Sequence, residues 1–173
     1  MKRWAVLALV GTLLITAWVG WDRYTKLRPQ TAAVARVNAP AEAGGLRFAV
    51  KGVQKLAQIE VVDDDPLVAM PGATWVRLDF SITLLDPTRP IDDLYCTGFL
   101  VSGASEWSDE DDPSSRNDRL ADSFCHGVGD DKPLTVGQVK PMVMYWLVPT
   151  WAAEAPQFFL RFSTASMSVE LRP

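Results

Sequence analysis

The sequence is poor in the residues on which most catalytic and metal sites depend. Its 173 residues include one histidine and two cysteines, and the formal net charge is −4. Imidazole is the commonest general base and zinc ligand near neutral pH, so a single histidine argues against most catalytic and metal architectures. A negative balance gives no support to nucleic-acid binding, which needs a basic surface. Since no phosphate loop, Gly-x-Ser-x-Gly or zinc-protease motif occurs either, we expect a non-enzymatic protein without a cofactor.

The remaining composition is that of a folded chain. Hydrophobic residues make up 48% and charged residues 22%, and there are seven tryptophans, which argues against disorder. The length allows one domain of ordinary size and a short appendage.

The N-terminal segment, residues 1–28, differs from the rest in charge and hydropathy. It holds five basic residues and one acidic residue, whereas the rest of the chain holds 12 basic and 20 acidic residues. Between Arg3 and Asp22 runs an uncharged stretch, Trp4–Trp21. As a helix this stretch is about 27 Å long, close to the hydrocarbon thickness of about 30 Å. Aromatic residues that favour the membrane interface flank it: Trp4, Trp18, Trp21 and Tyr24.

An uncleaved signal anchor explains this segment better than a cleaved signal peptide does. The apolar run exceeds the 7–15 residues or so of a signal peptide, and the candidate cleavage sites, Ile15–Ala17 and Trp18–Gly20, place large residues where small ones are needed. Basic residues are nearly balanced at the two ends, so charge does not decide the orientation. We place the C-terminal domain outside the cytoplasm on account of its cysteines, which makes this a single-pass protein of the cell membrane.

The next segment, residues 29–45, is rich in Ala, Pro and Gly and predicts a flexible linker, with a helix possible over its first half. From Leu46 onward the hydrophobic pattern has period two, which is typical of strands with one buried face. The clearest strand is Thr74–Leu84. We expect about seven strands, the others being 46–53, 58–62, 94–101, 142–148, 158–163 and 167–172. We expect 94–101 and 142–148, which are more continuously apolar, to be central strands covered on both faces. Prolines fall between these runs, so residues 46–173 predict an antiparallel, immunoglobulin-like β-sandwich.

Several segments of this region resemble a known family. They are GATWVRLDFSITLLDP, LYCTGFLVSG with its Cys96, the second cysteine Cys125, and Pro-Leu-x-x-Gly followed by Tyr-Trp-Leu-Val-Pro. Together they resemble the uncharacterised immunoglobulin-like extracytoplasmic domains of high-GC Gram-positive bacteria, which are carried on lipoproteins or single-pass anchors. The resemblance covers residues 46–173, except for an acidic insertion at 106–119. It implies a β-sandwich outside the membrane and transfers no active site.

The two cysteines, Cys96 and Cys125, predict a disulfide if the domain is translocated. Such a bridge contributes about 3–4 kcal/mol in the chain-entropy model. Two alternatives stay open, namely a metal site that adds His126 and a ligand from the acidic loop, and a reactive cysteine. Both are weaker, because adjacent residues rarely point at one ion and no Cys-x-x-Cys pair is present.

The acidic loop, residues 106–112, has two interpretations. Its carboxylates Asp109, Asp111 and Asp112 offer the oxygen ligands that Ca²⁺ takes, although no EF-hand spacing is present. The simpler interpretation is a solvated loop that keeps the domain soluble.

The large aromatic residues of this region also divide into two groups. We expect Trp75, Trp146, Phe80, Phe99, Phe158 and Phe162 in the core of the sandwich. Trp151 lies in a Pro-bounded loop beside two alanines and is a candidate anchor for a partner, since Trp is enriched at interface hot spots.

These features predict a membrane-anchored, extracytoplasmic interaction domain that binds another envelope or membrane protein. In its sharper form the protein is an accessory subunit of a larger respiratory or transport complex. The alternative is a module that binds Ca²⁺ or a small ligand through the acidic loop.

Overall fold

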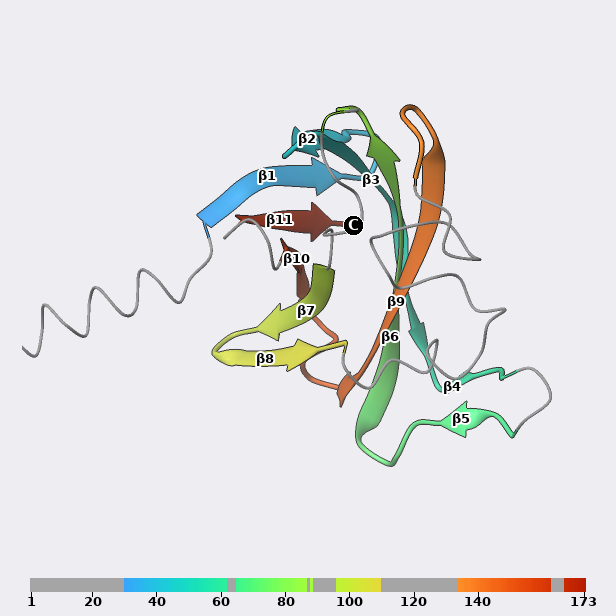
Figure 1. Ribbon diagram of the computed structural model, residues 1–173. Coiled ribbons are helices and arrows are strands. Elements are labelled where there is room, and N and C mark those ends of the chain that lie inside the picture. Colours follow the sequence, from blue (N-terminus) through green and yellow to red (C-terminus); the bar gives the residue numbers. More distant parts are fainter. Residues whose placement is uncertain (1–29, 62–64, 87, 89–95, 110–133, 163–166) are drawn as a thin grey trace, which may run out of the picture. The chain divides into compact units, whose positions relative to one another are not determined.

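The structure is a computed structural model, and it describes residues 30–173 except 62–64, 87, 89–95, 110–133 and 163–166 (Figure 1). The segment predicted to span the membrane, Trp4–Trp21, lies outside these residues. No helix long and apolar enough to cross a membrane occurs in the part of the chain that is described.

The described residues form eleven strands and no long helix. The strands are β1 (Gln30–Arg36), β2 (Ala41–Ala43), β3 (Leu46–Leu56), β4 (Gln58–Ile59), β5 (Leu67–Val68), β6 (Ala73–Leu84), β7 (Cys96–Ser102), β8 (Ser105–Ser108), β9 (Val139–Pro149), β10 (Gln157–Phe162) and β11 (Met167–Arg172). One sheet has the order β2-β3-β6-β9 and the other the order β1-β11-β10-β7-β8, while β4 and β5 form a small ribbon. Figure 1 shows the two larger sheets.

Both larger sheets contribute to one hydrophobic core. On β6, Val76, Leu78, Phe80 and Ile82 are fully buried, as the period-two pattern predicts. Phe158 and Leu160 of β10 and Leu100 of β7 belong to the same core. Each strand therefore turns alternate apolar side chains toward the opposing sheet. The predicted all-β, antiparallel sandwich is confirmed.

A second, smaller cluster lies on the other face of β6 and β9. It consists of Ile59, Trp75, Val143 and Tyr145. Trp75 also donates a hydrogen bond of 2.9 Å from Nε1 to the carbonyl oxygen of Leu67, which holds the β4–β5 ribbon against the sheet. Trp75 was therefore wrongly predicted for the central core, because odd-numbered positions of β6 face away from it.

The predicted strand 142–148 corresponds to β9, but its place in the sheet differs from our expectation. β9 lies at the end of its sheet and pairs with β6 alone among the described strands. Its continuous apolar sequence arises because even-numbered residues such as Met144 face the central core, while Val143 and Tyr145 belong to the second cluster. The continuously apolar sequence of β9 therefore indicates that both of its faces are covered, and it does not indicate a central position in the sheet.

The predicted flexible linker, residues 29–45, is a further correction, because both of its halves contain a strand and its first half is not a helix. Residues 30–36 form β1, which neighbours β11, and residues 41–43 form β2, which pairs with β3. Ala35 is fully buried, and Ala33 packs against the core. Alanine carries too little apolar surface to give a recognisable period, so these strands depend on pairing with the sheets for their stability.

Candidate functional site

The exposed tryptophan of the sandwich stands in the turn that follows β9. Its neighbour Thr150 donates a backbone hydrogen bond of 2.9 Å to Gly72, which ties the turn to the start of β6. Ala152 and Ala153 are fully buried beneath the turn. Trp151 itself remains 59% exposed, and its ring meets that of Trp107 edge-on, with centroids 5.8 Å apart. The turn thus presents an exposed indole that is restricted on one side by its contact with Trp107.

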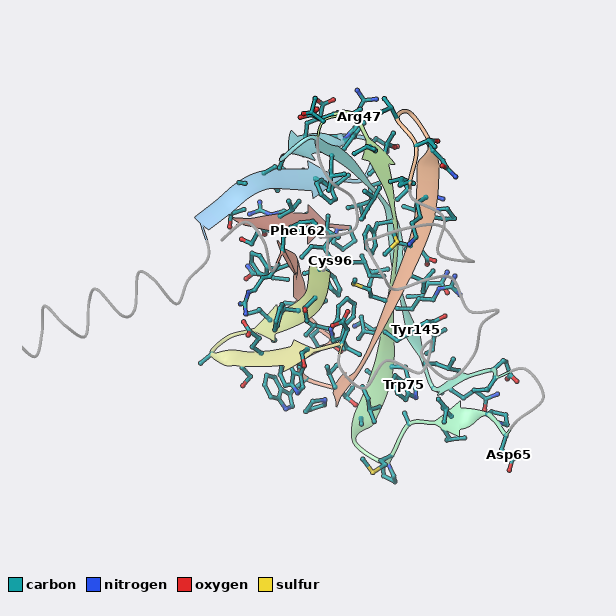
Figure 2. The ribbon with its side chains drawn as sticks, in the orientation of Figure 1. Arg47, Asp65, Trp75, Cys96, Tyr145 and Phe162 are labelled. Carbon is teal, nitrogen blue, oxygen red and sulfur yellow. The ribbon has the colours of Figure 1, made fainter. Side chains whose placement is uncertain are left out.

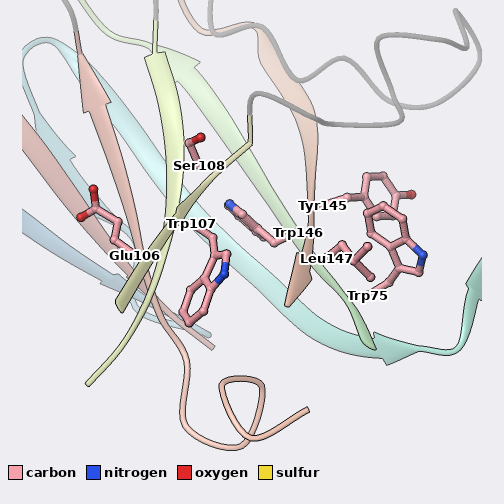
Figure 3. A pocket seen from close by; sticks show the side chains of 7 residues that line it. All are labelled: Trp75, Glu106, Trp107, Ser108, Tyr145, Trp146 and Leu147. Atoms are coloured by element: carbon pink, nitrogen blue, oxygen red, sulfur yellow. The ribbon is translucent and has the colours of Figure 1, made fainter. Parts of the chain in front are cut away.

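Trp107 lines a hollow between β8 and β9, so the two indole rings lie beside this hollow. Trp107 lies on β8 opposite Leu100 and packs against the central core. The hollow has a volume of about 410 Å³, which is within the range of small-molecule sites. The residues that line it are Trp75, Glu106, Trp107, Ser108, Tyr145, Trp146 and Leu147 (Figure 3). β8 is the edge strand of one sheet and β9 is the edge strand of the other. The hollow therefore opens at the side of the sandwich where no further described strand lies between the two edges.

The indole of Trp146 forms the inner part of the hollow. Trp146 is only 2% exposed, and its ring packs on Phe158 with centroids 5.4 Å apart. Its Nε1 is buried and has no hydrogen-bond partner in the described part of the chain. Figure 3 shows the nitrogen end of this ring directed toward β8. A buried donor without a partner costs free energy, whereas the Nε1 of Trp75 is satisfied by Leu67.

Gly98 on β7 leaves room for this ring. A Cβ atom at Gly98 would lie 2.9 Å from Cζ2 of Trp146 and 3.1 Å from Oδ2 of Asp109, and still closer to the sulfur of Met144. The position therefore requires glycine for steric reasons, and the glycine allows the indole to reach across the core.

An ion pair borders the hollow on the β8 side. Both carboxylate oxygens of Glu106 accept hydrogen bonds from Arg161 of β10, one of them 2.8 Å long. The guanidinium lies over the ring of Phe99, 3.9 Å from its centroid. The predicted acidic loop therefore begins later than residue 106, because Glu106 is part of β8. Phe99 was also wrongly predicted for the core, since it is half-buried beneath Arg161 on the outer face of the sheet.

Tyr145 contacts a charged pair on the neighbouring strand β6, on the same face of the sheet. The guanidinium of Arg77 lies 5.9 Å from the centroid of its ring, within the range of a cation–π contact. Arg77 also donates from Nη2 to Oδ1 of Asp79 over 2.7 Å. This hydrogen bond raises the pKa of Arg77 above its usual value, so the guanidinium is charged at every relevant pH.

The structure locates only part of the other predicted sites. Cys96 is the first residue of β7, is half-buried and pairs with Phe162 of β10 (Figure 2). Cys125 and His126 lie outside the described residues. The disulfide and its metal-binding alternative therefore stay predictions.

For the Ca²⁺ hypothesis, only Asp109 is described, and its backbone N–H donates to Gly98 over 3.1 Å. Asp111 and Asp112 lie outside the described residues, within which no cluster of three metal-binding side chains occurs. The Ca²⁺ site also stays a prediction.

Sequence reasoning predicted that Trp151 is exposed, which the structure confirms, and missed its surroundings. Trp107 and Trp146 lie far apart in the chain, and only the packing of the two sheets brings them to one hollow. A short polar strand such as Ser105–Ser108 gives no hydrophobic period by which it could be predicted.

Comparison with solved structures supports the fold. The chain is similar to the crystal structure of a conserved hypothetical protein from Bacillus anthracis, with a TM-score of 0.51 and 10% identity over 78% of this chain and 93% of that chain. An uncharacterised β-sandwich protein from Clostridium difficile 630 gives a TM-score of 0.44 and 10% identity over 83% of this chain and 95% of that chain. No protein-family model and no curated protein match the sequence. At such identity the first likeness shows the fold alone, and neither supports the more specific resemblance to domains of high-GC Gram-positive bacteria.

Proposed function

We propose that this protein is a non-enzymatic, membrane-anchored extracytoplasmic domain that docks onto another envelope or membrane protein as an accessory subunit. The observation that carries the proposal is the exposed indole of Trp151, held edge-on against Trp107 in a turn that is tied to β6. We call these two side chains the indole pair. The docking surface of the proposal is centred on it.

The indole pair has the physical properties of an interface anchor. Tryptophan supplies a large contact area with few rotatable bonds, and it is enriched among the residues that dominate binding energy. Here the contact with Trp107 and the buried alanines behind the turn already restrict Trp151. Less conformational entropy is therefore lost when a partner covers it.

The proposed location rests on residues 1–28, whose uncharged run matches the thickness of a bilayer. An anchor confines the domain to a thin layer next to the membrane and raises its local concentration toward membrane-bound partners. Nucleic acid is a poor candidate partner, since the chain after residue 28 has 12 basic and 20 acidic residues.

The immunoglobulin-like class is part of the proposal. In one sheet the order β3-β6-β9 matches the A-B-E order of such sandwiches, and in the other sheet β11-β10-β7-β8 matches G-F-C-C′. The letters are assigned to these seven strands in their order along the chain, and the β4–β5 ribbon is left out. The disulfide between Cys96 and Cys125 belongs to the same proposal, since it requires an oxidising space.

Native electrophoresis of membrane extracts tests the proposal. The full chain should migrate in mild detergent as a complex of defined stoichiometry, and Trp151→Ala should release it as a free chain. Val139→Ala is the matched control, because Val139 is also 59% exposed and lies at the opposite end of β9. Migration of the unaltered chain as a monomer, or equal behaviour of the two variants, would contradict the docking proposal.

A further inference from the structure

We propose that the hollow between β8 and β9 binds the acetamido group of an N-acetylated sugar. The proposal goes beyond protein docking, and apart from Trp107, which belongs to both surfaces, it rests on different observations. These are the N–H of Trp146, which has no partner among the described residues, the polar groups of β8 and the aromatic rings around them.

The N–H of Trp146 requires an acceptor. Its side chain is almost fully buried, and its nitrogen has no partner among the described residues, although the ring lines the hollow. A ligand oxygen that accepts this hydrogen bond removes the cost of the unsatisfied donor. Trp75 lines the same hollow and needs no such oxygen, because Leu67 already accepts from it.

The charges around the hollow favour a neutral ligand. Aromatic rings next to a carboxylate can form a cage for a cation, but Glu106 is already paired with Arg161 through both oxygens. The donor of Trp146 also directs its positive end toward β8 and so opposes a cation. An anion is disfavoured in turn, because Glu106 borders the hollow, while Arg161, which pairs with Glu106 through Nη1 and Nη2 and whose Nε has no partner among the described residues, does not line it.

An acetamido group matches the available groups one by one. Its carbonyl oxygen accepts from Trp146, and its N–H donates to the hydroxyl of Ser108 or to a remaining lone pair of Glu106, since a carboxylate has about four acceptor positions. Its methyl group packs against the indole rings. The volume of about 410 Å³ admits one such group with its ring.

Trp107 favours a sugar over an acetylated lysine side chain as the carrier of this group. Its half-buried ring offers the broad apolar surface that the C–H face of a pyranose ring covers. A linear lysine side chain would leave most of that surface in contact with water.

Solution NMR on the full chain in detergent micelles tests the proposal directly. The indole N–H resonance of Trp146 is identified through its contacts with the Phe158 ring, which packs on it. Titration with chitotetraose should shift this resonance saturably and leave that of Trp75 nearly unchanged. Cellotetraose, which lacks acetamido groups, should bind at least tenfold more weakly. No shift of Trp146 with chitotetraose, an equal effect of cellotetraose, or a shift only with an Nε-acetyl-lysine peptide would overturn the proposal.

A pair of variants separates this site from the docking surface. Ser108→Ala should weaken chitotetraose binding by about three- to tenfold, the effect of one neutral hydrogen bond. Trp151→Ala should weaken chitotetraose binding less than Ser108→Ala does, because Trp151 touches Trp107 but does not line the hollow, while it abolishes the protein complex. Unchanged chitotetraose affinity in both Ser108→Ala and Glu106→Gln would overturn the proposed contacts, whatever the outcome for the protein partner.

Discussion

Replacement of Gly98 by alanine tests the packing between the sheets. The added Cβ would clash with the sulfur of Met144 and would lie 2.9 Å from Cζ2 of Trp146. Met144 is fully buried and Trp146 is rigid, so neither side chain can move without disturbing the core. Overpacking of this kind costs about 1–3 kcal/mol of unfolding free energy.

The control is Gly52→Ala on β3, where the added Cβ meets nothing within 4 Å. We expect it to be neutral or to stabilise by about 0.4–1 kcal/mol, since alanine restricts the unfolded chain. Urea unfolding of the full chain, followed by tryptophan fluorescence, measures both. With a slope of about 2 kcal/mol per molar, the midpoint for Gly98→Ala should fall by about 0.5–1.5 M with the slope unchanged. Equal midpoints for the two variants would refute the account of Gly98 and of the position of Trp146.

The remaining predictions concern single interactions and the two open sites. Trp75→Phe should lower the unfolding free energy by about 1 kcal/mol or more in the same assay, because the bond to Leu67 is lost; an unchanged value would contradict its role at the β4–β5 ribbon. Glu106→Gln should change stability by less than about 1 kcal/mol, since its ion pair with Arg161 is partly exposed, and a larger loss would contradict that interpretation. Cys96 and Cys125 should resist maleimide labelling without reductant, and reduction should lower stability by about 3–4 kcal/mol; rapid labelling would exclude the disulfide. Millimolar Ca²⁺ should raise the melting temperature if the acidic loop binds it, and an unchanged temperature would leave its carboxylates as solubilising charge.

The strands with a regular pattern were predictable because burial of one face imposes period two. Thr74–Leu84 differs from β6 by a single residue, and its even-numbered apolar residues are all buried. The same reasoning located β3, β10 and β11. The hydrophobic period of a strand does not show which other strands pair with it, however. The position of β9 at the edge of its sheet was therefore not predicted.

The short or alanine-rich strands were not predictable in this way. β1 depends on its place next to β11, and β8 depends on β7, because neither sequence has a recognisable hydrophobic period. The hollow was missed for a related reason. The exposure of Trp151 could be inferred from its loop, whereas its contact with Trp107 and the burial of the Trp146 N–H, which lacks a partner among the described residues, arise from tertiary packing.

Site-specific photo-crosslinking in native membranes tests the proposed docking surface most directly. A photoreactive phenylalanine at position 151 should form a crosslink to one membrane protein, whereas the same group at position 139, where the native side chain is equally exposed, should form none. A crosslink from both positions, or from neither, would contradict docking through the indole pair.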